Sequence, residues 1–322
     1  MEATVKDPTN LPKKDILEIF KQGNGGIVMT SFNWPGALRF RACAFVAMVK
    51  GYFSVGEFFR ILLPSSLSPG KLGLLQKYND FLCHELETYF PSFPKNHVNL
   101  FGHPFGSMNY YEVFELVEDV IIKDQYHIQE RLAKDSVVID AGANIGTFSV
   151  FAAHLVPQGK VYSFEPVKGT YELLKANTAP YPQVTCVNAG LGSQVAQKKM
   201  LVDSKYTTRN VVEDSPFYSA ISGSGEEKRF EIANILTIDQ FVSENKIPRI
   251  DFIKADTEGY EVHVLNGARE SIKKWKPVIG ISAYHNEKDK QEIPQILKEI
   301  DQNYVCELCT NDREEDFICY VK

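Results

Sequence analysis

The stretch VVIDAGANIGTFS, residues 137–149, decides the fold class. It has the pattern of a short apolar strand, a turn containing Gly142 and Gly146, and the start of a helix. Glycine has no Cβ, so such a turn bends tightly and lets a ligand approach the backbone. The spacing departs from the G-x-G-x-x-G fingerprint that binds a diphosphate. The stretch therefore predicts a ligand site at the carboxyl end of the strand, with pyrophosphate a poor fit.

Strand and helix patterns alternate around this stretch. SVVIDAG, KVYSFEP, QVTCVNAGLG, RIDFIKADTEG and KPVIGISAYH are expected to form five strands in chain order. Such alternation predicts an α/β protein with a mostly parallel, Rossmann-like sheet that helices cover on both faces. The segments Tyr304–Leu308 and Asp316–Val321 should close one edge, with the last strand antiparallel.

The chain is expected to divide into two parts. Residues 1–95 show helical periodicity and predict an N-terminal helical cap that takes part in substrate selection; its pieces are Ile16–Lys21, Ala37–Lys50, Val55–Leu63 and Leu72–Phe90. Residues 96–322 should form the Rossmann-like domain. Within it, NYYEVFELVEDVII, residues 109–122, suggests a hairpin, and the polar segment near 203–228 suggests a flexible insertion that closes over a site.

Composition narrows the function classes. The chain is 44% hydrophobic and 24% charged with a net charge of −6, typical of a globular protein and unfavourable for a long nucleic-acid surface. The first residues are polar and no stretch is long enough to span a bilayer, so we expect a cytoplasmic protein without a membrane partner. The six scattered cysteines favour reduced thiols. Cys306 and Cys309 have metal-like spacing, but ordinary strand packing explains them better.

Two acidic residues suggest which ligand the sheet binds. Asp140 would repel a diphosphate but pair with an ammonium group, and S-adenosylmethionine carries both an ammonium and a sulfonium. Glu165 ends the second strand, where an acidic residue commonly accepts hydrogen bonds from ribose hydroxyls. Phe164 flanks it, and Asn188 lies where an adenine edge would be, although a turn-forming role is equally plausible for Asn188. Alternatively, Asp140 and Asn144 merely cap the turn and helix.

The ends of the fourth and fifth strands supply candidate catalytic and substrate-binding groups. Lys254, Asp256 and Glu258 are positioned to hold a methyl acceptor or remove its proton, although the carboxylates also suit the first turn of a helix. His285 is the candidate base, because an imidazole titrates near neutral pH. Tyr284 beside it is a candidate substrate contact that points to the other face of a regular strand. No set of metal ligands is predicted.

In this order, VVIDAGANIGTFS, FEP, TIDQF, FIKADTEGYE and ISAYH resemble the FkbM family of methyltransferases, over roughly the last two-thirds of the chain. The resemblance implies a class I methyltransferase fold with S-adenosylmethionine as donor, and many relatives methylate hydroxyl groups of natural products or sugars. Asn144 stands where the general methyltransferase pattern has its middle glycine, as the FkbM-like form allows. By position, the resemblance places Asp256 near the reacting centre and these residues around the cofactor: Asp140, Gly142, Asn144, Gly146 and Glu165.

The resulting hypothesis is direct displacement, in which a hydroxyl oxygen of a small molecule attacks the sulfonium methyl and His285 or Asp256 accepts the proton. One rival changes the acceptor to the nitrogen of a peptide or amine. Another keeps the fold as a non-catalytic scaffold, and the weakest is an NAD-dependent oxidoreductase. The sequence does not indicate the acceptor or the oligomeric state.

Overall fold

A computed structural model of the chain describes residues 97–101, 103–107, 112, 116–203, 206–216, 218, 228–311 and 314–322. The chain divides into two compact units, Met1–Glu115 and Leu116–Lys322. In the first unit, β1 (His97–Leu100) pairs antiparallel with β2 (His103–Gly106). The helices predicted before residue 95 lie outside the described residues, so the predicted cap stays a prediction.

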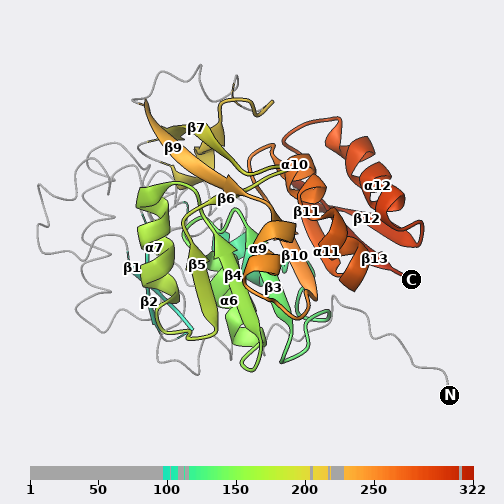
Figure 1. Cartoon of the computed structure of the whole chain (residues 1–322). Coiled ribbons are helices and arrows are strands. Elements are labelled where there is room, and N and C mark those ends of the chain that lie inside the picture. The colour runs from blue at the N-terminus through green and yellow to red at the C-terminus, as the bar shows by residue number, and fades with distance from the viewer. Residues whose placement is uncertain are drawn as a thin grey trace, which may run out of the picture. The chain divides into compact units, whose positions relative to one another are not determined.

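The second unit is built on a seven-stranded sheet (Figure 1). All neighbouring strands from β11 to β5 run parallel, whereas β13 is antiparallel to both β11 and β12. The expected mostly parallel sheet with an antiparallel last strand is therefore confirmed. In spatial order the strands are β12 (Tyr304–Asn311), β13 (Glu314–Val321), β11 (Val278–Ser282), β10 (Phe252–Ala255), β3 (Val137–Ala141), β4 (Lys160–Phe164) and β5 (Val184–Val187).

Helices cover both faces of this sheet, as the apolar strands require. On one face Phe148 of α6 (Thr147–Leu155) stacks on Phe252, with ring centroids 6.2 Å apart. The other face packs into one large apolar cluster against α9 (Ile238–Glu244), α10 (Glu261–Asn266), α11 (Arg269–Trp275) and α12 (Asp289–Ile300). Figure 1 shows α7 (Lys168–Thr178) beside β5 at one edge and α12 beside β12 at the other.

A second, four-stranded sheet was not predicted from the sequence. QVTCVNAGLG was expected to be one strand, but it divides into β5 and β6 (Gly190–Leu191), which belong to different sheets. The strand breaks where Asn188 donates side-chain hydrogen bonds to the carbonyls of Glu165 and Pro166, at 2.9 and 3.1 Å. β6 then continues the order with β9 (Lys228–Leu236), β7 (Ala196–Asp203) and β8 (Val211–Val212), seen at the top of Figure 1.

The hairpin predicted for residues 109–122 is wrong in its described part. Glu118–Ile122 form a helical turn, η2, of the π type. Val117, Val120 and Ile121 are buried and recur at helical spacing, so packing overrides the strand propensity of β-branched residues.

The predicted insertion contains ordered structure where it is described. The segment carries η3 (Thr207–Arg209) and then β8, while Ser222–Gly225 lie outside the described residues. The Ser215 hydroxyl donates a 2.7 Å hydrogen bond to the carbonyl of Glu258. The insertion is thereby tied to the loop that follows β10, and its role as a lid stays a prediction.

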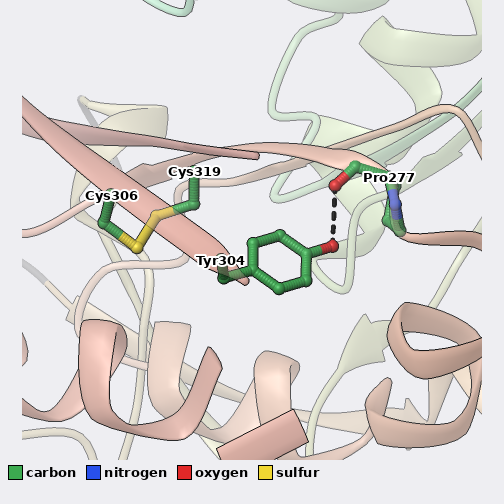
Figure 2. The surroundings of a disulfide bond; sticks show 4 residues. All are labelled: Pro277, Tyr304, Cys306 and Cys319. Carbon is green, nitrogen blue, oxygen red and sulfur yellow. Dashed lines mark hydrogen bonds between the residues drawn. A yellow bond between two sulfur atoms is a disulfide. The ribbon is translucent and has the colours of Figure 1, made fainter. Parts of the chain in front are cut away.

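The prediction of reduced cysteines is wrong for one pair. Cys306 and Cys319 form a disulfide between β12 and β13, which were correctly predicted as two strands joined by a polar turn (Figure 2). The antiparallel register places the two residues directly opposite, with Cα atoms 4.1 Å apart. Cys309 is a free thiol, so Cys306 and Cys309 do not act as a metal-binding pair. Nearby, Tyr304 is buried and donates to the carbonyl of Pro277 at 2.9 Å (Figure 2).

Candidate active site

The turn after β3 has a conformation that depends on its glycines. Gly142, Asn144 and Gly146 all have positive φ, at 74°, 50° and 97°. A Cβ on Gly142 would lie 1.9 Å from the carbonyl oxygen of Asp256, and one on Gly146 would lie 2.9 Å from Cδ1 of Leu174. The first glycine therefore lets the loops after β3 and β10 touch, and the second lets α6 pack against α7.

Glu165 joins this turn to the end of β4. One carboxylate oxygen accepts the backbone N–H of Asn144 at 3.1 Å, and the other accepts that of Val167 at 2.9 Å. Burial raises the pKa of Glu165 from 4.5 to about 7, although these two hydrogen bonds oppose the shift. The carboxylate thus lies beside the glycine turn, where the sequence analysis expected it to meet a ribose.

The other two residues predicted around the adenosine have structural roles. The ring of Phe164 is fully buried and packs edge-to-face on Phe241, with centroids 4.8 Å apart. Its carbonyl accepts the N–H of Ala143. Asn188 makes the turn-forming contacts with the β4 loop described above, which is the alternative that the sequence analysis left open.

Asp140 is fully buried within the sheet and already has a cationic neighbour. The parallel register places Asp140 between Ser163 of β4 and Lys254 of β10. The Lys254 ammonium lies 3.4 Å from one carboxylate oxygen, and the Ser149 hydroxyl donates to the other at 2.6 Å. The electrostatic argument that Asp140 needs a ligand ammonium is weakened, because Lys254 supplies a positive charge inside the protein. Burial raises the pKa of Asp140, while Lys254 opposes that rise.

Lys254, predicted as a substrate contact, lies beneath the glycine turn. Its side chain is 5% exposed, and its ammonium donates to the carbonyl of Gly142 at 2.7 Å. This places Lys254 as a support for the backbone of the turn.

Within the described part of the chain, several buried polar atoms around these loops have no hydrogen-bond partner. They are the side-chain oxygens Asn144 Oδ1, Thr147 Oγ1, Asp256 Oδ1 and Thr257 Oγ1. All four follow β3 or β10, the two central strands whose loops touch at Gly142. Buried polar atoms are normally hydrogen-bonded, so this group fits a polar ligand held over the centre of the sheet edge.

The structure brings Asp256, Glu258 and His285 together. His285 Nε2 lies 3.3 Å from Glu258 Oε2 and 3.9 Å from Asp256 Oδ1. Its other nitrogen, Nδ1, lies 3.1 Å from Oε1 of Glu261, a buried residue at the start of α10. Burial alone would lower the pKa of His285, but Glu261 and Glu258 raise it well above 6.5. With these carboxylates ionised, His285 already carries a proton at neutral pH, which disfavours it as a base in this state.

More acidic groups line the same edge. The antiparallel register brings Asp316 opposite Ser282, whose hydroxyl donates to it at 3.0 Å, and Gln125 donates to both Asp316 and Glu314. Burial raises the pKa of Glu314 to about 8 and that of Asp316 to about 7, with nearby carboxylates adding to the effect. The edge around β11 is therefore strongly acidic and largely buried.

Two tyrosines complete this region. Tyr126 donates a 3.1 Å hydrogen bond to Oδ2 of Asp256, which fixes that carboxylate. Tyr284 packs against His285, with ring centroids 4.2 Å apart. Burial and the carboxylates around Asp256 raise the pKa of both phenols well above 10. Each therefore stays protonated and available as a hydrogen-bond donor.

Sequence reasoning missed five groups at this edge: Gln125, Tyr126, Glu261, Glu314 and Asp316. Asp316 had a usable signal, because a carboxylate at the start of the apolar run FICYV is unusual in a buried strand. Glu261 gave no separate signal, because an acidic residue is common in the first turn of a helix. Gln125 and Tyr126 gave no signal, because they reach the site from a separate segment.

The strand order fits the class I methyltransferase fold, and the family model that matches this chain describes a methyltransferase domain. The chain belongs to the family described as the methyltransferase FkbM domain, whose model matches residues 140–306, more than half of the chain. The suspected resemblance is thus confirmed. The cofactor of the family, S-adenosylmethionine, fits the buried oxygens of Asn144, Thr147 and Thr257, which have no hydrogen-bond partner among the described residues.

Three curated proteins show the range of the similarity. The chain is 26% identical over 195 residues to AMB antimetabolite synthetase AmbE of Pseudomonas aeruginosa, covering 52% of the chain and 9% of that protein. It is 25% identical to hexuronic acid methyltransferase AglP of Haloferax volcanii, covering 59% of the chain and 72% of AglP. It is also 25% identical to 31-O-demethyl-FK506 methyltransferase FkbM of Streptomyces tacrolimicus, covering 44% of the chain and 62% of that protein.

Among solved structures, the chain resembles methyltransferase FkbM from Methylobacillus flagellatus, with 17% identity and a TM-score of 0.45. That match covers 89% of this chain and 60% of the other. In the described part of the chain, no helix combines the length and apolar character needed to cross a bilayer.

Proposed function

We propose that this protein transfers the methyl group of S-adenosylmethionine to a hydroxyl oxygen of a small molecule. The observation that carries the proposal is the contact between the glycine turn and the loop of Asp256, where an ideal Cβ on Gly142 would overlap the carbonyl of Asp256. This contact places candidate cofactor groups and candidate acceptor groups on adjoining loops. A hydroxyl acceptor is supported by the names of two relatives, hexuronic acid methyltransferase AglP and 31-O-demethyl-FK506 methyltransferase FkbM.

The cofactor supplies an activated methyl group, so the protein's tasks are orientation, exclusion of water and proton removal. The acceptor oxygen forms a bond to the methyl carbon while the carbon–sulfur bond breaks and its electron pair stays on sulfur. The hydroxyl proton leaves to the carboxylates beside the acceptor. Asp256 is the best-placed recipient, because Tyr126 fixes one of its oxygens and the other has no hydrogen-bond partner.

Product analysis tests this proposal. The full chain is incubated with S-adenosylmethionine and three sets of acceptors: uronic acid glycosides, macrocyclic alcohols, and amines or short peptides. Mass spectrometry should show the gain of one CH2 on a hydroxyl acceptor, with release of S-adenosylhomocysteine. Methylation confined to the amine set would refute oxygen transfer. A chain that binds no S-adenosylhomocysteine by calorimetry would instead be a scaffold of this fold.

Two variants test whether methyl transfer depends on Asp256. Asp256→Asn removes the charge that receives the proton and should lower turnover by about 100-fold or more, the usual contribution of a general base. Asp214→Asn removes an exposed carboxylate that pairs with Lys198 and serves as the control, with turnover unchanged. Equal turnover of both variants would remove Asp256 from the reaction.

A further inference from the structure

The cluster of Asp256, Glu258 and His285 has the composition and dimensions of a metal site. One ligand atom from each residue lies within 4.8 Å of the others. The loops after the neighbouring strands β10 and β11 supply the residues. Unlike a purely acidic patch, the cluster contains an imidazole nitrogen aimed between two carboxylates.

The histidine is oriented as metal-binding histidines usually are. Oε1 of Glu261 also accepts the backbone N–H of Thr257 at 2.7 Å, so this oxygen is fixed as an acceptor facing Nδ1 of His285. Nδ1 then carries a hydrogen, and Nε2 directs a lone pair toward Glu258 and Asp256 once a cation has displaced its proton. A carboxylate that orients a ligating histidine through its other nitrogen is the common outer-shell arrangement at metal sites. Both side chains are nearly fully buried, so the orientation is rigid.

An independent observation comes from Asp256. Its Oδ2 is held by Tyr126, but Oδ1 is buried and has no hydrogen-bond partner among the residues that the structure describes. Oδ1 is the oxygen that faces Nε2 of His285 at 3.9 Å. A buried carboxylate oxygen left without a donor is costly, and a cation at this point would satisfy it.

The distances suit a small divalent ion. With metal–ligand bonds of about 2.0–2.2 Å, neighbouring ligands are about 3 Å apart and opposite ligands about 4.3 Å apart. The 3.3 Å and 3.9 Å separations fall within this range, and small side-chain rotations would close the widest pair. Mixed nitrogen and oxygen ligands favour Mn²⁺, Fe²⁺ or Zn²⁺ over Ca²⁺.

The surrounding charge favours a dication. Among the described residues, the acidic groups near His285 are Asp256, Glu258, Glu261, Asp289, Glu314 and Asp316, and a dication would favour the ionised form of each. The nearby buried cation Lys254 is engaged with Asp140 and the glycine turn.

We propose that Asp256, Glu258 and His285 bind one divalent transition-metal ion that coordinates the acceptor of the methyl group. Three protein ligands leave open positions for water or for oxygens of the acceptor. A coordinated hydroxyl loses its proton more readily, because the metal stabilises the negative oxygen; with Oδ1 of Asp256 on the ion, that proton passes to solvent water. The role toward the acceptor rests on the proposed methyl transfer, whereas binding of the ion does not.

Calorimetric titration of the full chain with MnCl2, without cofactor or acceptor, tests the site. The wild-type protein should bind about one equivalent of Mn²⁺, and His285→Gln or Glu258→Gln should weaken that affinity tenfold or more. Glu299→Gln removes an exposed carboxylate paired with Arg269 and should leave the affinity unchanged. Each variant is also titrated with S-adenosylhomocysteine, and retained affinity shows that the variant is folded.

Two results would overturn the proposal: no Mn²⁺ binding by the wild-type chain, or equal Mn²⁺ affinity in the wild type and in folded variants of His285 and Glu258. Activity is measured separately with and without EDTA. Full methyl transfer in EDTA would refute the metal's role toward the acceptor while leaving the proposed function intact. Metal binding without any methyl transfer would leave the metal site intact and count against the proposed function.

Discussion

Replacement of Glu165 by Gln offers the sharpest test of how the cofactor loops are built. The side chain is 5% exposed, and its two oxygens accept the N–H groups of Asn144 and Val167. Glutamine keeps the shape but has only one oxygen, so one of these N–H groups must face an NH2 group. Loss of a hydrogen bond to a charged acceptor costs about 1.5–3 kcal/mol.

The same substitution removes a pH dependence of the free energy of unfolding, and the raised pKa of Glu165 fixes the sign of that dependence. The folded protein holds a proton on Glu165 up to about pH 7, whereas the unfolded chain releases it near 4.5. The folded state therefore binds more protons between these values, and Glu165 makes the free energy of unfolding fall as pH rises. One pKa unit corresponds to about 1.4 kcal/mol, so the fall is about 3 kcal/mol between pH 4.5 and pH 7.

Urea unfolding at pH 5 and pH 8 measures this effect. From pH 5 to pH 8, the free energy of unfolding of the wild-type protein should fall by about 3 kcal/mol more than that of Glu165→Gln. Other buried acids titrate in both proteins and cancel in the difference. Glu172→Gln, on the exposed side of α7, is the matched control and should follow the wild type. Equal pH slopes in the wild type and in Glu165→Gln would refute the reasoning.

The same residue predicts the pH dependence of cofactor binding. Only the ionised carboxylate presents two acceptors, so affinity for S-adenosylhomocysteine should be about tenfold weaker at pH 6 than at pH 8. Calorimetric titration of the wild type and of Glu165→Gln with S-adenosylhomocysteine at both pH values checks this prediction. The variant should bind weakly, with little dependence on pH.

Three further changes probe the supports of the site. Gly142→Ala should abolish S-adenosylhomocysteine binding in calorimetry, because its Cβ would overlap a backbone carbonyl at 1.9 Å; normal affinity would contradict this. Lys254→Met should destabilise the protein by about 3–5 kcal/mol by leaving Asp140 buried and unpaired. Adding Asp140→Asn should recover part of that loss in thermal melts, and simple additivity would argue against the pairing. Mass spectrometry after alkylation should find Cys306 and Cys319 unmodified until the protein is reduced, and alkylation without reduction would disprove the disulfide. Changing both cysteines to Ser should lower the free energy of unfolding by up to about 3 kcal/mol.

The sequence by itself determined the parts of this protein that depend on local patterns. Apolar runs that lead to Asp140, Glu165 and Asp256 predicted the central strands, and Gly142 and Gly146 predicted the turn that approaches a ligand. Because parallel strands end at a common edge, these patterns also predicted where the site lies.

Only the tertiary structure decided the partners of those residues. Asp140 was expected to need a ligand ammonium, but strand register sets Lys254 beside it. Likewise, Glu261 reaches His285 only because α10 packs against the edge. The second sheet and the disulfide have the same origin, since pairing between distant segments follows from register and packing, which no local pattern encodes.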